Sequence, residues 1–526
     1  MNLWTMLARA NELYPRELAA VDGERRLDYA TVFARASALG ACLQDRGVHV
    51  GERVAVLEHN SVEFLELYFA CAAAGAILCP LNTRLAAPEL AAILVDSEAR
   101  VLFANRGFAD AVRRTLALGT AVELVVWLGG DAGRLDDART LVYEDTLDSD
   151  GRALRVAPES EVVVAQLYYT SGTTGRPKGV MLTHRNVSEH ALAAIAELSL
   201  SDRDVWGHIA PMFHLADAWA TFALTWVGGR HVFVPHFDEE RVLDAIERER
   251  ITITNLIPTM LNRLVRRDGV EQRDFASFRR ILSGGASIAP EVVHRVCQVF
   301  GCEYVQTYGM TETSPYLTLS LLKANLALLA PDEQFRFRAK TGRPFLAIEL
   351  AVIGDDERPV ARDGVAVGEI RVRGATVTPG YWNRPEETRA AFKDGWLCTG
   401  DLATIDAEGY VQIVDRKKDM INSGGEKVYS TEVEHALYAH PAVLEAAVFG
   451  VPDEEWGEAV RAAVVLRPGA RADAAELQAH CRERLAGFKV PRAIEFLAEL
   501  PKTGTGKITK LALRAAAAGD PGSPRV

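Results

Sequence analysis

The sequence has no CxxC pair among its seven cysteines and no histidines spaced with them for zinc. This excludes the common zinc-binding patterns, and we interpret the thiols as reduced and mostly buried. Long apolar runs are also missing. The longest one, YFACAAAGAILCPL (residues 68–81), is too short to span a bilayer and predicts a buried helix followed by a strand.

Positive charge is in short supply. The chain has 59 Lys and Arg against 71 Asp and Glu, a net charge of −12, which argues against a nucleic-acid partner. A local basic pocket for one nucleotide is still compatible with this balance. The first residues, MNLWTMLARANELYPRELA, carry early acids and no continuous apolar segment, so they do not read as a signal peptide. We expect a cytoplasmic protein without a transmembrane segment.

The length of 526 residues predicts two or more domains. Short β-type runs alternate with amphipathic helices over residues 53–105, 205–258 and 278–309, which predicts parallel α/β layers. From Gly342 the β-type runs shorten and predict a small barrel, and an α+β pattern follows Asp415. We therefore predict an α/β fold. A large N-terminal domain (1–416) has two related α/β subdomains plus a small β-barrel, and a small mobile α+β C-terminal domain (417–526) follows.

The stretch YYTSGTTGRPKGV (residues 168–180) concentrates glycines, hydroxyls and a single Lys after an apolar run. Backbone N–H groups of such a loop form a donor-rich concavity, and Lys178 adds a point charge, so phosphate is the natural ligand. It is not a Walker motif, because Lys178 follows Pro177. The later PKTGTGKITK does not fit that motif either, since Ile508 follows Lys507. Taken alone, the loop could equally be an ordinary surface turn.

Further motifs strengthen the functional interpretation. SGGAS (283–287) and QTYGMTET (306–313) each follow or end a predicted strand, where ligands gather in open α/β sheets. GWLCTGD (395–401), DRKKDMINSGGEKV (415–428) and PKTGTGKITK (501–510) come later. In this order the motifs resemble the adenylate-forming (AMP-binding) superfamily of acyl- and aryl-CoA ligases, peptide-synthetase adenylation domains and luciferases. The resemblance covers about residues 5–515 and is nearest to bacterial medium- and long-chain fatty-acyl-CoA ligases (acyl-CoA synthetases).

The resemblance implies a role for each motif residue. The ATP and AMP site would consist of Thr170, Ser171, Gly172, Thr173, Thr174 and Lys178 around the β- and γ-phosphates, Gly284, Gly285, Ala286, Gln306, Thr307 and Tyr308 around the adenine, and Asp401 and Arg416 on the ribose. The catalytic residues would be Thr311 at the α-phosphate, Glu312 as the Mg²⁺ ligand, and Lys507. Lys418, Gly424, Gly425 and Glu426 would form the hinge and the CoA site, and His214, Ala218 and Gly309 the acyl pocket. Considered singly, Tyr308, Asp401 and His214 could be structural residues.

The implied reaction has two steps. A carboxylate attacks the α-phosphorus of ATP and pyrophosphate leaves, with Mg²⁺ and Lys507 supplying positive charge. The thiol of coenzyme A then attacks the acyl-AMP. No GxSxG nucleophile motif is present, in keeping with this scheme.

We therefore predict an ATP-dependent, AMP-forming acid–thiol ligase for a hydrophobic monocarboxylic acid, with a fatty acid favoured. An aryl- or alicyclic-acid CoA ligase is one alternative. A non-catalytic protein, or one that performs a single half-reaction on acyl-adenylates, is the other. Whether the chain forms a homodimer is left open.

Residues near the predicted acyl pocket bear on the choice of acid. His214 stands where peptide-synthetase domains have an Asp for the substrate amine, which favours an acid without an α-amine. The gating Trp of some long-chain relatives is replaced by Ala218, and Trp219 comes one residue later. Asp217 would be costly to bury unless it is paired. These departures leave the chain length open.

Two positions in the C-terminal region also depart from the resemblance. Asn422 stands where plant hydroxycinnamate ligases and luciferases have a Lys, which argues against those substrates. Ser430 replaces a commonly seen Pro, and no function is assigned to it.

Overall fold

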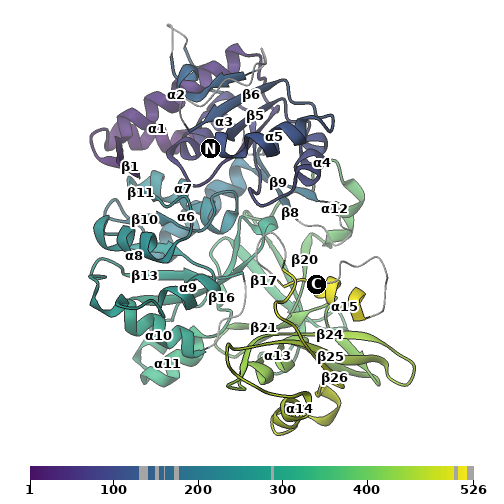
Figure 1. Cartoon of the computed structure of the whole chain (residues 1–526). Helices are drawn as coiled ribbons and strands as arrows, with labels where there is room; N and C mark the ends of the chain where they lie inside the picture. The colour runs from purple at the N-terminus through teal and green to yellow at the C-terminus, as the bar shows by residue number, and fades with distance from the viewer. Residues whose placement is uncertain are drawn as a thin grey trace. The chain divides into compact units, whose positions relative to one another are not determined.

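A computed structural model describes residues 1–129, 140–148, 153–158, 160, 162–170, 177–285, 290–502 and 508–517 (Figure 1). The chain divides into two compact units. The larger unit comprises Met1–Leu350 with Val372–Leu397, and the smaller comprises Ala351–Arg371 with Cys398–Val526. The smaller unit thus includes residues that precede position 417, and the domain boundary drawn there stays a prediction.

The larger unit contains a nine-stranded sheet whose central strands are all parallel, with antiparallel strands at both edges. Its order is β16 (Arg343–Pro344), β15 (Tyr316–Leu319), β14 (Glu303–Gly309), β13 (Arg280–Ser283), β12 (Ile253–Asn255), β10 (Val205–His208), β11 (Arg230–Phe233), β1 (Leu18–Asp22) and β2 (Arg25–Asp28).

A seven-stranded sheet belongs to the same unit. It is parallel except for the last pair, β8 and β9. Its order is β7 (Thr140–Val142), β6 (Leu124–Leu128), β5 (Val101–Asn105), β3 (Arg53–Leu57), β4 (Ile77–Pro80), β8 (Val164–Thr170) and β9 (Lys178–Thr183).

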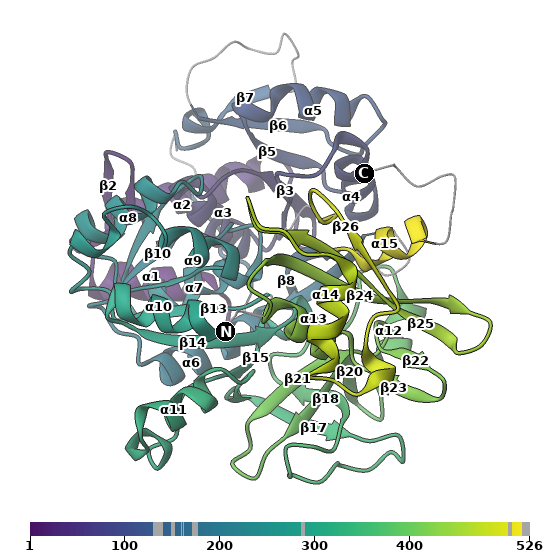
Figure 2. The ribbon, with the colours of Figure 1, turned by 60° about the horizontal axis from the view of Figure 1, so that its bottom comes forward.

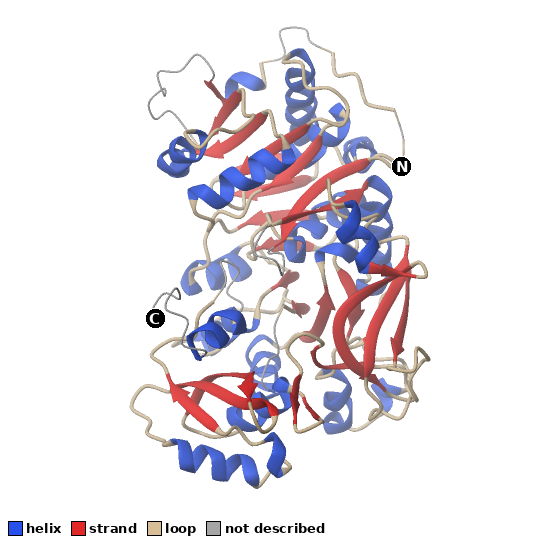
Figure 3. Ribbon diagram, turned by 90° about the vertical axis from the view of Figure 1, so that its right-hand side faces the viewer, coloured by secondary structure: helices blue, strands red, loops and turns tan. Residues whose placement is uncertain are grey.

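Helices flank the strands of these sheets (Figure 3). They are α1 (Trp4–Leu13), α2 (Tyr29–Asp45), α3 (Val62–Ala74), α4 (Ala87–Ser97), α5 (Ala109–Leu116), α6 (His184–Leu198), α7 (Leu215–Val227), α8 (Glu239–Arg248), α9 (Pro258–Leu264), α10 (Pro290–Phe300), α11 (Pro331–Arg338) and α12 (Pro385–Ala391). Short 3-10 helices are η1 (Arg106–Phe108), η2 (Tyr143–Thr146), η3 (Val270–Gln272), η4 (Thr311–Thr313) and η5 (Leu326–Leu328).

Local sequence explains where several helices begin and end. The Ser61 side chain accepts a hydrogen bond from the Phe64 backbone and caps α3, while Gly75 ends that helix in the left-handed conformation. Thr183 and Asn186 form a reciprocal cap at the start of α6. The predicted helix-plus-strand interpretation of residues 68–81 is confirmed by α3 and β4.

The largest apolar cluster joins residues of α1, α2, α3, α6 and α7 with residues of both large sheets. Side chains such as Trp206, Trp219, Phe64 and Phe222 are almost completely buried in it. Fully burying a side chain of this kind contributes about 1.5–3 kcal/mol. The cluster therefore packs α6 and α7 against the large sheets.

A five-stranded sheet follows, with the order β17 (Ile348–Ile353), β18 (Gly368–Gly374), β20 (Trp396–Ile405) and β19 (Phe392–Lys393), and with β21 (Val411–Arg416) paired to β20. A second five-stranded sheet in the smaller unit contains β22 (Ile421–Ser423), β23 (Glu426–Val428), β24 (Val443–Asp453), β25 (Gly457–Leu466) and β26 (Ala493–Phe496). The helices of this unit are α13 (Ser430–Tyr438), α14 (Ala474–Arg482), α15 (Lys510–Ala517) and the 3-10 helix η6 (Gly487–Lys489).

Helices α13 and α14 pack on this last sheet (Figure 2), with Val433, Leu437 and Leu477 in the same apolar cluster as Val448 and Val460. The predicted fold class, an α/β protein with a small α+β C-terminal part, is confirmed. Within the described ranges, every helix is too short or too polar to span a bilayer.

Candidate active site

The end of β14 carries the central motif of the candidate site. Gln306, Thr307, Tyr308 and Gly309 are its last residues, and η4 follows with Thr311 and Glu312.

Gly309 is paired with Tyr316 of the antiparallel strand β15. A Cβ at Gly309 would lie 1.9 Å from the Pro315 carbonyl oxygen, so only glycine fits this close approach. The tight packing of β15 on β14 therefore fixes where Glu312 lies.

Glu312 is buried and held by two residues far away in sequence. The Tyr381 hydroxyl donates to Glu312 Oε1 at 2.9 Å, and the Thr378 backbone N–H donates to the Glu312 carbonyl at 2.8 Å. Burial, together with the negative charge of Glu312, raises the pKa of Tyr381, so this phenol stays protonated and donates.

Lys178 lies over the ring of Tyr381. Its Nζ is 5.4 Å from the ring centroid, a cation–π distance. Lys178 begins β9 and is paired with Thr170 at the end of β8, so these two residues bound the glycine-rich loop. Ser171, Gly172, Thr173 and Thr174 lie outside the described residues. The structure thus brings together Lys178, Tyr381 and Glu312, and the sequence analysis had not singled out Tyr381.

The SGG turn after β13 packs directly against β14. The Thr307 hydroxyl donates to the Ser283 carbonyl at 3.1 Å, and a Cβ at Gly284 would lie 2.3 Å from Thr307 Oγ1. Gly285 has a φ of +82°, which glycine adopts without strain. Tyr308 is half-buried beside this turn in the sheet, and Ala286 lies outside the described residues.

His214 occupies the N-cap position of α7, and Ala218 is fully buried one turn later. The ring of His214 is 4.6 Å from that of Phe213, centroid to centroid. Asp217 is also fully buried, but its carboxylate is hydrogen-bonded: Trp206 Nε1 donates to it at 3.1 Å, and His208 Nδ1 contacts its other oxygen. The concern about a buried acid is resolved, because Asp217 is paired.

The smaller unit holds the other predicted nucleotide residues. Asp401 on β20 and Arg416 on β21 are direct partners across the strand pair, and Arg416 Nε lies 3.4 Å from Asp401 Oδ1. Two residues predicted to bind one sugar are therefore neighbours. Lys507 lies outside the described residues.

Lys418 lies in a turn after β21, where the backbone N–H groups of Asp419 and Met420 donate to the Arg416 carbonyl. Gly424 and Gly425 form the two-residue turn between β22 and β23, with Ser423 and Glu426 paired on either side.

Both glycines have positive φ values, +64° and +85°, which this kind of hairpin turn requires. A Cβ at Gly424 would lie 2.6 Å from the Trp456 ring, so the turn also needs a glycine for close packing.

Ser430 forms a buried network that the sequence analysis missed. Its backbone N–H donates to the Asp415 carboxylate, its hydroxyl lies 3.0 Å from Asp415 Oδ1, and Lys510 donates to the same hydroxyl. Lys510 also pairs with Glu434 at 2.8 Å. Burial raises the pKa of Asp415. A proline at position 430 would lack the N–H that holds Asp415, and this is why the serine matters here.

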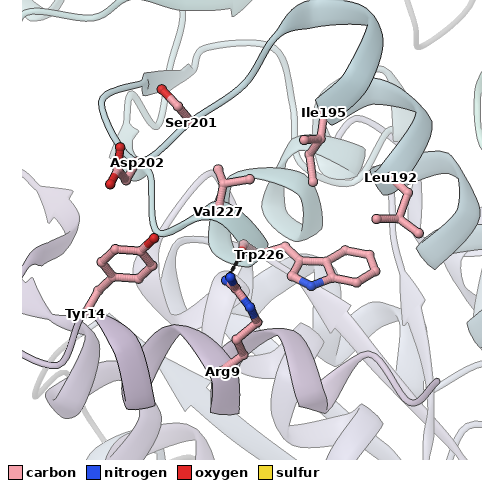
Figure 4. Close-up of a pocket in the computed structure, with 8 residues that line it drawn as sticks. All are labelled: Arg9, Tyr14, Leu192, Ile195, Ser201, Asp202, Trp226 and Val227. Atoms are coloured by element: carbon pink, nitrogen blue, oxygen red, sulfur yellow. Dashed lines mark hydrogen bonds between the residues drawn. The ribbon is translucent and has the colours of Figure 1, made fainter.

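A cavity of about 410 Å³ lies elsewhere in the larger unit (Figure 4). Its lining residues are Arg9, Tyr14, Leu192, Ile195, Ser201, Asp202, Trp226 and Val227. Arg9 Nη1 donates to the Trp226 carbonyl at 2.6 Å, as Figure 4 shows. The cavity contains none of the residues predicted for the site, and we assign no role to it.

Comparisons with known proteins place this geometry in a family. The family model for the AMP-binding enzyme matches residues 7–382, and the family model for the AMP-binding enzyme C-terminal domain matches residues 432–507. The chain therefore belongs to the AMP-binding enzyme family, as the sequence motifs predicted. At the level of the family it is an ATP-dependent, AMP-forming acyl-CoA ligase.

Relatives are similar over nearly the whole chain. A feruloyl-CoA synthase of Amycolatopsis is 39% identical over 503 residues, 95% of this chain and 96% of that protein. A long-chain-fatty-acid–CoA ligase of Thermus thermophilus is 37% identical, covering 98% of this chain and 95% of that protein. The ATP-bound structure of MatB from Rhodopseudomonas palustris has a TM-score of 0.84 at 30% identity, covering 98% and 99% of the two chains. The acids that these names carry belong to different classes.

Proposed function

We propose that the protein activates a hydrophobic monocarboxylic acid to its acyl-AMP and transfers the acyl group to coenzyme A. The observation that supports this best is the meeting of Lys178, Tyr381 and Glu312 at the end of the glycine-rich loop. A fixed carboxylate beside a lysine is what a metal–triphosphate complex needs, since each binds the partner of opposite charge.

The residues fit Mg²⁺ as a cofactor carried by ATP. Among the described residues, no group of three His, Cys, Asp or Glu could hold a metal ion on its own. A single carboxylate, Glu312, suits Mg²⁺, which is usually bound by one or two carboxylates together with substrate phosphates and water. When bound, the ion would neutralise phosphate charge. Tyr381 would orient Glu312 for this role, and Thr311 would contact the α-phosphate.

In the proposed first step, a carboxylate oxygen of the acid forms a bond to the α-phosphorus, and the bond to pyrophosphate breaks. Thr170, Lys178 and the loop between them would hold the β- and γ-phosphates, and Lys507 would neutralise charge between the two reacting anions. Residues Gly284, Gly285, Ala286, Gln306, Thr307 and Tyr308 would surround the adenine. Asp401 and Arg416 would bind the ribose hydroxyls.

In the second step the thiol of coenzyme A attacks the acyl carbon and AMP leaves. The thiol and Lys507 need the same space, so we propose that the C-terminal domain changes orientation about Lys418. The turn at Gly424 and Gly425, with Glu426 beside it, would then face the pantetheine arm. Glycines permit such a close approach.

Fatty acids and aryl or alicyclic acids both fit the proposal, and one observation favours the aryl or alicyclic class. A fatty acid needs a long apolar channel beside His214, Ala218 and Gly309. The space between α6, α7 and β15 is instead filled by the rings of Trp219, Tyr316 and Phe345, each at most 3% exposed. This favours a compact aryl or alicyclic acid over a long chain. Asn422 argues against the substrates of plant hydroxycinnamate ligases and luciferases. One bacterial relative is nevertheless a feruloyl-CoA synthase, so hydroxycinnamates belong among the acids to test.

The direct test is acid-dependent pyrophosphate release over a panel of fatty, aryl and amino acids. Lys507→Ala should lower this rate about 10²–10³-fold, a typical loss for one electrostatic donor, yet still convert supplied acyl-AMP and coenzyme A to thioester. Lys502→Ala is the matched control, because Lys502 pairs with Glu445 at 2.7 Å and should change neither rate. The proposal fails if no acid on the panel stimulates pyrophosphate release, and the role of Lys507 fails if both steps fall equally.

A further inference from the structure

Tyr316 is the first residue of β15 and lies opposite Gly309, the last residue of β14. Its ring is packed on several sides by aromatic rings. The centroid distances are 5.3 Å to His190, 5.3 Å to Trp219 and 5.8 Å to Phe345. The residue is 3% exposed, so its hydroxyl is out of reach of bulk water.

This hydroxyl makes no hydrogen bond within the described part of the chain. The polar neighbour is the Trp219 indole, but its N–H is donated to the Ala216 carbonyl at 3.2 Å. Leaving a buried hydroxyl unpaired costs about 1–3 kcal/mol, and such groups are rare in native proteins. An unpaired group of this kind therefore calls for a partner that the described residues do not supply.

Other buried tyrosines of the larger unit have protein partners. The Tyr68 hydroxyl donates to the Met212 carbonyl at 2.8 Å, the Tyr29 hydroxyl donates to the Gly229 carbonyl, and the Tyr304 hydroxyl donates to Gln306 Oε1. The contrast separates Tyr316 from tyrosines whose hydroxyls serve the fold.

The position of Tyr316 points to a ligand. In parallel α/β sheets, ligands bind beyond the carboxyl ends of the strands. Gly309 ends the parallel strand β14, and Ala216, beside the indole of Trp219, belongs to the first turn of α7, which follows the carboxyl end of β10. The unpaired hydroxyl thus lies among elements that begin or end at the ligand-binding edge of the sheet.

We propose that the Tyr316 hydroxyl is a specificity determinant that hydrogen-bonds an oxygen substituent, a phenolic hydroxyl, on the distal ring of the substrate acid. The substrate class is then a hydroxylated aryl acid. This inference rests on the proposed function. The surrounding rings suit an aromatic ligand, because aromatic pairs pack favourably at centroid distances of about 4.5–7 Å. A site built to bind a substrate hydroxyl discriminates against the analogue that lacks it, since its own polar group is then left unpaired.

The test compares matched acids that differ by one hydroxyl. The pairs are 4-hydroxycinnamate with cinnamate, and 3-(4-hydroxyphenyl)propanoate with 3-phenylpropanoate. The wild type should show a higher kcat/KM for the hydroxylated member of each pair. Tyr316→Phe should reduce that preference about 10-fold, by slowing the reaction of the hydroxylated acid only, as expected for the loss of one hydrogen bond of about 1.4 kcal/mol.

Tyr29→Phe is the matched control, because it removes a buried hydroxyl whose partner is a protein carbonyl, and it should leave the preference unchanged. An equal fall for both acids in Tyr316→Phe, an unchanged ratio, or a wild type that prefers the unsubstituted acid would each overturn the assignment to Tyr316. If the wild type releases no pyrophosphate with any acid, the proposed function itself is wrong, and the assignment to Tyr316 is wrong with it.

Discussion

Helix α7 lies between two buried polar regions that differ in whether each polar group has a hydrogen-bond partner among the described residues. On one side Asp217 joins Trp206, His208, His231 and Thr225 in a continuous hydrogen-bonded chain, with 2.9 Å between the two imidazoles and 3.0 Å from His231 to the Thr225 hydroxyl.

On another side of α7, Trp219 packs against Tyr316, whose hydroxyl has no partner among the described residues. A polar network with every member paired serves the fold, whereas a buried group without a partner points to a ligand.

One arrangement of protons satisfies every member of this chain. If Asp217 is ionised, it accepts from Trp206 and from His208 Nδ1, so His208 Nε2 accepts from His231 Nδ1 and the Thr225 hydroxyl donates to His231 Nε2. Burial lowers the pKa of His231 well below its ordinary value, in keeping with a neutral ring. The network ties α7 to β10 and β11 and holds the turn that carries His214.

The largest effect is expected from breaking the paired network. Asp217→Ala leaves the His208 imidazole and the Trp206 indole N–H without their acceptor and should lower the free energy of unfolding by about 3–5 kcal/mol. Urea unfolding followed by tryptophan fluorescence would measure it, since Trp206 and Trp219 are neighbours of the site. Asp202→Ala, at an exposed position, is the control and should stay within about 0.5 kcal/mol of the wild type. Equal stability of the two variants would contradict the structural role of the network.

A smaller loss of stability is expected at low pH, because of His190 in the aromatic cluster around Tyr316. Burial lowers the pKa of His190 to about 3, and its Nε2 accepts from the Tyr316 backbone N–H at 3.3 Å. The unfolded chain binds a proton here below about pH 6.5, while the folded protein does not until about pH 3. Stability due to this residue therefore falls with decreasing pH, by up to about 1.4 kcal/mol per unit below pH 6.5.

His190→Gln removes the titrating group but keeps a hydrogen-bond acceptor. The difference in unfolding free energy between wild type and variant should change by about 1 kcal/mol from pH 6.5 to pH 5.5. A difference that does not depend on pH in this range would mean that His190 is not held neutral in the cluster.

The smallest effect is expected for the stability of Tyr316→Phe. The variant loses a hydroxyl that has no partner in the described residues, so the free energy of unfolding should stay within about 0.5 kcal/mol of the wild type or rise. Tyr68→Phe, which removes a paired hydroxyl, should instead lose about 1 kcal/mol. A larger loss in Tyr316→Phe than in Tyr68→Phe would assign the Tyr316 hydroxyl to the fold rather than to a ligand.

Much of the fold and the family could be predicted from local patterns in the sequence. The alternation of apolar strands and helices predicted the α/β layers, because it reflects burial on one or both faces of each element. The motif order predicted the family, and Asp401 with Arg416 turned out to be neighbours across a strand pair.

Contacts between distant segments could not be predicted. Tyr381 is the partner of Glu312 although the two are 69 positions apart, and its segment reads as an ordinary turn. The pairing of Asp217 with His208, and of Ser430 with Asp415, depends on how strands and helices pack against one another, which residue spacing does not encode.

The central claim is that a carboxylate oxygen of the acid attacks the α-phosphorus of ATP before the acyl group passes to coenzyme A. An acid labelled with ¹⁸O in its carboxylate tests this directly, by mass spectrometry of the nucleotide product after a complete turnover with ATP, Mg²⁺ and coenzyme A. In this mechanism one labelled oxygen stays on the α-phosphorus when AMP leaves, so AMP carries one ¹⁸O and pyrophosphate carries none. Release of ADP, or a label found in phosphate rather than in AMP, would contradict the account.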